Sequence, residues 1–88
     1  MCERWTIAVA KKAENLEPLE SIINSFFDFE GPLLGITVKP KGTNYVVFQK
    51  GRRKCTQKGA LKRPWWIAGL SRDLRAAGLK PQIKKVTI

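Results

Sequence analysis

Residues 33–50, LLGITVKPKGTNYVVFQK, contain the pattern that decides the fold. Two runs rich in β-forming residues, 33–39 and 45–50, flank a short segment that holds Pro40, Gly42 and Asn44, which are typical turn residues. The pattern predicts a β-hairpin with a loop over 40–44. Three consecutive apolar residues at 46–48 are typical of a central, well-covered strand.

A helix is predicted before this hairpin. Asn15 can cap it, Pro18 is tolerated in a first turn, and Gly31-Pro32 ends it. Steps of three and four residues separate the members of one apolar face, which are Leu16, Leu19, Ile22, Ile23, Phe26 and Phe27.

A second helix is predicted after the hairpin, from Pro64, which suits a first helical position, to Gly78, a strong C-terminal stop. Its apolar stripe consists of Trp66, Ile67, Leu70, Leu74 and Ala77. Since adjacent helical residues diverge by about 100°, Trp65 cannot share the core site of Trp66 and is expected to be partly exposed.

The first and the last segment of the chain are each predicted to form a strand. Residues 4–10 alternate Trp5, Ile7 and Val9 with less apolar residues, and residues 82–88 carry Lys84-Lys85, which suggests an exposed edge. The order strand, helix, strand, strand, helix, strand predicts an α+β fold. It is the ferredoxin-like βαββαβ arrangement, a four-stranded antiparallel sheet with two helices packed on one face. We expect residues 1–88 to form one basic domain.

Charge is distributed unevenly along the chain. The 88 residues carry a net charge of +10; residues 1–31 hold three cations and six carboxylates, whereas residues 32–88 hold fourteen cations and only Asp73. So dense a surplus is typical of proteins that bind a polyanion. We therefore expect a nucleic-acid partner, provided that these cations gather on one surface.

Residues 49–64 are the richest part of that surplus. Seven of the sixteen are cationic and none is acidic, and two glycines and a proline predict a flexible basic loop. Arginine and lysine neutralise phosphates without reading sequence, and Trp65 beside such a loop could stack on a base. The predicted nucleic-acid-binding residues are Lys41, Tyr45, Lys50, Arg52, Arg53, Lys54, Lys58, Lys62, Arg63 and Trp65.

Lys41 to Phe48, KGTNYVVF, also resembles the octamer on the third strand of RNA-recognition-motif domains. The resemblance implies that Tyr45 is an exposed stacking aromatic on the open sheet face, with Val46 and Phe48 buried. Thr43 stands where the family has another stacking aromatic, and Asn44 stands where it has a small residue.

Several classes of activity are disfavoured. The chain has no histidine, its two cysteines lie more than fifty residues apart, and no glycine-rich phosphate loop is present. We expect no enzyme, metal or cofactor, although Cys55 beside Arg53 and Lys54 is the one interesting nucleophile.

Without a signal core or a membrane-length apolar run, we expect an intracellular protein, in the cytoplasm, or in the nucleoid or nucleus if it binds DNA. RNA or single-stranded DNA is favoured, and duplex DNA comes second. The alternative is a non-catalytic interaction protein that docks its basic face on an acidic protein partner or assembly. The sequence also leaves open whether the chain forms a homodimer.

Overall fold

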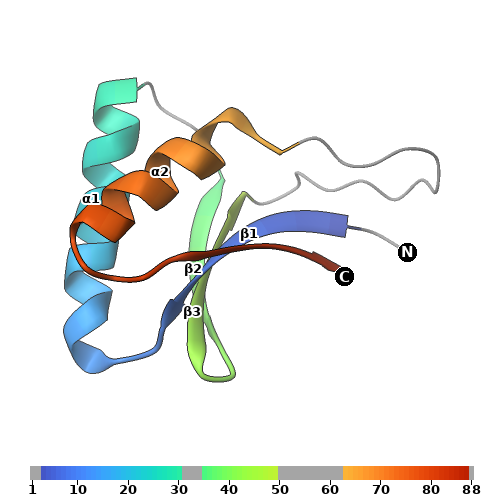
Figure 1. The fold of residues 1–88 in the computed structure, drawn as a ribbon, viewed down its shortest axis with the longest axis horizontal. Helices are drawn as coiled ribbons and strands as arrows, with labels where there is room; N and C mark the ends of the chain where they lie inside the picture. The colour runs from blue at the N-terminus through green and yellow to red at the C-terminus, as the bar shows by residue number, and fades with distance from the viewer. Residues whose placement is uncertain (1–2, 31–34, 50–62, 88) are drawn as a thin grey trace.

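The computed structural model describes residues 3–30, 35–49 and 63–87. Its elements follow one another in the predicted order (Figure 1), as β1 (Glu3–Ala10), α1 (Ala13–Glu30), β2 (Ile36–Lys41), β3 (Asn44–Gln49), α2 (Trp65–Ala76) and β4 (Gln82–Thr87). The four strands form one sheet in the order β2-β3-β1-β4, and every neighbouring pair is antiparallel. This confirms the ferredoxin-like α+β fold, and it makes β4 an edge strand as the lysines suggested.

The hairpin between β2 and β3 is tighter than the predicted loop over 40–44. Pairing continues to Lys41 opposite Asn44, which leaves only Gly42 and Thr43 in the turn. Gly42 has a φ of +61°, the left-handed region that a type II′ turn requires at its first central residue. Pro40 is accommodated inside β2 because that strand is an edge.

The start of α1 also differs from the prediction. The helix begins at Ala13, so Asn15 lies inside it rather than capping it, and its side-chain amide donates to the carbonyl of Ala10 at 2.9 Å. Pro18 is then the sixth helical residue rather than a member of the first turn. Asn15 therefore fastens the start of α1 to the end of β1.

The end of α2 follows the prediction. The backbone N–H of Gly78 donates to the carbonyl of Arg75, and that of Leu79 donates to the carbonyl of Leu74, which together form a Schellman motif. Gly78 supplies the required left-handed conformation with a φ of +83°. Ala77, expected in the apolar stripe, is exposed at the C-cap, and Ser71 is buried instead.

Both helices pack on one face of the sheet around a single core (Figure 1). Gly69 of α2 lies so close to the Phe26 ring that an added Cβ would come within 3.0 Å of it, so the glycine permits a close approach of the helices. The core joins apolar residues from β1, β3 and both helices, among them Ile7, Val9, Leu19, Ile23, Phe27, Val47, Trp66, Ile67, Leu70 and Leu74.

Candidate functional site

The strands divide their residues between two faces. Ile7 and Val9 of β1 and Val47 of β3 belong to the core under the helices, so the alternate residues of each strand point to the opposite side. Cross-strand pairing places the same-face partners together across all four strands. We call this side the open face; it comprises Arg4, Thr6, Ala8, Ala10, Thr37, Lys39, Lys41, Asn44, Val46, Phe48, Gln82, Lys84 and Val86.

The open face is cationic. Arg4, Lys39, Lys41 and Lys84 lie on it, and no carboxylate lies on it among the strand residues that the structure describes. Glu3, the one acidic residue of the described strands, falls on the opposite side, where its carboxylate pairs with Lys85 at 3.4 Å. The sheet thus presents four positive charges without an acidic neighbour on the same face.

Arg4 is held in place by an aromatic ring. Its guanidinium lies 4.3 Å from the centroid of Phe48, and its Nε is buried without a hydrogen-bond partner. Such a cation–π contact fixes the position of the charge while the group stays positive. It also shields Phe48, which is only 9% exposed although both described helices, α1 and α2, pack on the other face.

A shallow hollow lies in the middle of the open face. Its volume is about 240 Å³ and it is lined by Thr6, Ala8, Lys41, Asn44, Val46, Lys84 and Val86. The central residues are small and closely surrounded, since Thr6 is 3% exposed and Ala8 is 5% exposed. The Thr6 hydroxyl donates to the backbone carbonyl of Lys84 at 3.1 Å and so does not project from the floor as a free polar group.

One acidic residue of α1 comes close to this surface. Glu14 lines a concavity of about 410 Å³ that it shares with Ala8, Ala10, Asn44 and Gln82 of the open face. Glu17, Glu20 and Asp28 are exposed on the same helix, which packs on the other side of the sheet. Within residues 3–30, 35–49 and 63–87, the Glu3–Lys85 contact is the one ion pair. The cations beyond residue 31 do not all share one surface, however, because Arg72 and Arg75 lie exposed on α2.

Six of the ten sequence-predicted site residues lie outside the described residues: Lys50, Arg52, Arg53, Lys54, Lys58 and Lys62. Cys55 lies outside them as well. Of the four that are described, the structure places only Lys41 on the open face.

The placement of Tyr45 on the open face is wrong. Tyr45 pairs with Val9 and Pro40 and packs against the core under the helices. Phe48 is buried as the resemblance implied, but on the open face, beneath Arg4. The alternation of β3 is thus opposite to that of the RNA-recognition-motif octamer, because the register pairs Val47, rather than Val46, with the core residue Ile7.

Arg63 lies over the ring of Trp5 in β1. Its guanidinium is 4.9 Å from the centroid of the Trp5 ring, and the ammonium group of Lys85 is 5.8 Å from the same centroid. Arg63 is therefore held on the helix-covered side, near the start of β1. It belongs to a different surface from Lys41, which lies at the turn end of the sheet.

Trp65 and Trp66 separate as predicted. Trp66 is fully buried, whereas Trp65 is 58% exposed at the start of α2. One side of Trp65 packs on Phe26, with ring centroids 6.0 Å apart and an interplanar angle of 24°, and Phe27 approaches its edge at 6.3 Å. The exposed ring lies on the helix layer, so it does not extend the open face.

Sequence reasoning missed Arg4, Lys39 and Lys84 as members of a common surface. The signal was present in the alternation of residues 4–10, which places Arg4 opposite Trp5 and Ile7. Lys39 and Lys84 could be added only once the pairing was known, because they come from opposite edges of the sheet.

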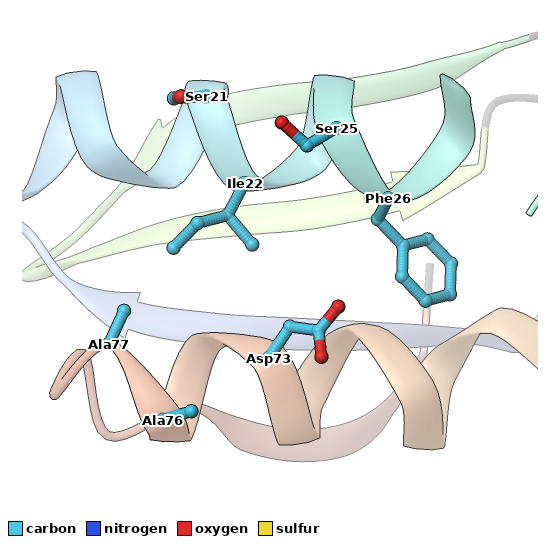
Figure 2. A pocket seen from close by; sticks show the side chains of 7 residues that line it. All are labelled: Ser21, Ile22, Ser25, Phe26, Asp73, Ala76 and Ala77. Atoms are coloured by element: carbon cyan, nitrogen blue, oxygen red, sulfur yellow. The ribbon is translucent and has the colours of Figure 1, made fainter. Parts of the chain in front are cut away.

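A second concavity lies between the two helices. Figure 2 shows Ile22 and Phe26 pointing from α1 toward α2, and Asp73 pointing from α2 toward α1. This groove, of about 460 Å³, combines apolar walls with one carboxylate that makes no ion pair among the described residues. Its charge is opposite to that of the open face, so the two concavities cannot favour the same ligand.

Across the described parts of the chain, no group of three or more cysteine, aspartate or glutamate side chains is placed to hold a metal ion. None of the helices described is long and apolar enough to cross a membrane. Comparisons with protein-family models, curated proteins and solved structures found no match to this chain.

Proposed function

We propose that this protein binds nucleic acid through the open face of its sheet, with RNA or single-stranded DNA preferred and duplex DNA second. The observation that carries the proposal is the charge of that face, which has four cations and no carboxylate among its described residues. Phosphates attract such a surface whatever the base sequence, because each neutralised phosphate releases condensed counterions.

The spacing of the cations supports this proposal. Lys39 and Lys41 lie two residues apart on one strand, about 6.6 Å along it. This separation is shorter than the Debye length of about 8 Å at physiological ionic strength, so their fields add rather than being screened from one another. Two exposed ammonium groups so close repel each other unless a polyanion lies against them.

The rigidity of the support also favours binding. Arg4 lies on the central strand β1, and its guanidinium is fixed over Phe48. Cations held by a sheet lose less conformational freedom on binding than cations on a mobile segment. Residues 49–64 add seven further cations to the protein. From the sequence we expect these cations to take part in the same binding.

Two triple variants test the proposal. K39Q/K41Q/K84Q removes three exposed charges from the open face, and R72Q/R75Q/K85Q removes three exposed charges from α2 and the opposite side of the sheet. Both lower the net charge from +10 to +7, so only the position of the loss differs. Fluorescence anisotropy with labelled 12-mers of U and of dT, and with a 12-base-pair DNA duplex, measures Kd over a range of salt concentrations.

We expect the open-face variant to bind weakly. The slope of the logarithm of its affinity for single strands against the logarithm of the salt concentration should be shallower by about 2. The control variant should lose much less affinity. Equal losses in both variants would show that net charge acts without a defined surface. A wild-type protein that binds none of the three probes at low salt would contradict the proposal and leave the acidic-protein partner as the alternative.

A further inference from the structure

We infer that the hollow of the open face seats one unpaired nucleobase of a single-stranded nucleic acid, an inference that rests on the proposed function. The size of the hollow sets the first limit. Its volume of about 240 Å³ lies below the roughly 300–1,000 Å³ of sites for drug-sized ligands, so it suits one ring system rather than a whole cofactor.

The lining of the hollow matches the flat face of a base. Ala8, which is 5% exposed, and Thr6, whose hydroxyl is already engaged with Lys84, form part of a closed floor. Val46 and Val86 add apolar surface from the strands on either side of β1. A planar apolar face can lie on such a lining without leaving a polar group of the lining buried and unpaired.

The charged residues of the hollow suit the backbone on both sides of that base. Lys41 belongs to β2 and Lys84 to β4, which are the two edge strands, three strand spacings or roughly 14 Å apart across the sheet. Lys41 is level with Ala10 and Lys84 with Thr6, so the two lysines are also offset by roughly 14 Å along the strands and lie diagonally across the hollow. A nucleotide within a chain has a phosphate on each side. A strand that crosses the sheet from β2 to β4 therefore meets one lysine before the base and one after it.

Asn44 supplies the polar contact that a base edge needs. Its amide lines the hollow and carries both donors and an acceptor. In a duplex each base is stacked on its neighbours and paired along its edge, so neither its face nor its pairing edge can enter the hollow. The hollow thus separates single strands from duplexes, whereas the surrounding charge attracts both.

Filling the hollow tests the inference. A8I adds a bulky side chain at its centre on the side away from the core, and A68I makes the same change at an exposed position of α2, on the opposite side of the sheet. The probes are the 12-mers of U and dT and the 12-base-pair duplex. Thermal unfolding by circular dichroism reports whether each variant folds, and if A8I does not, A8V is one carbon smaller and replaces it.

We expect A8I to weaken binding to the single strands by about fivefold or more, because the added side chain fills the space in which the base would lie on apolar surface. Its duplex affinity should change by less than about twofold, because phosphates alone set that binding. A68I should behave as wild type. If A8I weakens binding to single strands and duplex equally, or weakens neither, the inference is overturned while the proposed function stands. If the wild-type protein binds no probe, both are overturned.

Discussion

The two faces of the sheet are built from alternate residues of the same strands, and they differ in every property that matters for function. The helix-covered face places Ile7, Val9 and Val47 at 0–1% exposure. The open face carries four cations, and two of them, Lys41 and Lys84, line a hollow with a small-residue floor. The comparison teaches that a period of two lets one strand serve stability on one side and recognition on the other.

The division is not absolute, because β1 is buried on both sides. Thr6 and Ala8 are 3% and 5% exposed although the two helices of the described residues pack on the other face. They are small residues on a central strand, and their larger neighbours on β3 and β4 shield them. Burial by itself therefore does not tell the two faces apart, whereas side-chain size and charge do.

The largest effect should come from the helix-covered face. Leu70 is fully buried in α2, so Leu70→Ala should lower the free energy of unfolding by about 2–5 kcal/mol through lost burial and the cavity left behind. Urea unfolding measures this. Lys84→Ala on the exposed edge is the control and should change stability by less than about 0.5 kcal/mol. Similar losses in the two variants would contradict the assignment of the core.

Tyr45→Ala sharpens the comparison, because Tyr45 was expected on the open face and lies against the core. We expect a loss of about 1–3 kcal/mol in the free energy of unfolding, less than for a fully buried aromatic residue. The Kd of the folded variant for single strands should match that of wild type, measured by anisotropy well below its melting temperature. A higher Kd with unchanged stability would instead show that Tyr45 belongs to the binding surface.

The smallest effect concerns the contact between Arg4 and Phe48 on the open face. A double-mutant cycle of Arg4→Gln and Phe48→Leu should give a coupling energy of about 0.5–1 kcal/mol, the usual scale of a cation–π pair at a partly exposed site. Chemical unfolding of the four proteins measures it. A coupling energy of zero would mean that the ring does not position the guanidinium.

The sequence pattern was most reliable where periodicity was clear. Trp5, Ile7 and Val9 alternate cleanly, and the members of the α2 stripe from Trp66 to Leu74 follow helical steps, so both elements were predicted together with their buried sides. The pattern failed for Val46 to Phe48, because three apolar residues in a row fit either face. It also missed that Asn15 lies inside a helix, since the amide reaches back to Ala10 instead of capping.

The candidate site was only partly predictable for a related reason. The basic segment at 49–64 is contiguous in the chain and is visible without a structure, although most of it lies outside the described residues. The cations of the open face are separated by as many as eighty positions, from Arg4 to Lys84. No local pattern links them, because strand pairing alone brings them together.

The amino-acid sequence by itself determined the order of the elements, their apolar sides and the excess of positive charge, because these depend on neighbours a few residues apart along the chain. Only the tertiary structure decided which strands pair, which side of β3 meets the helices, and which cations share a face. Register makes the difference: a shift of one residue exchanges the two faces of a strand, and contacts distant in the sequence fix that register.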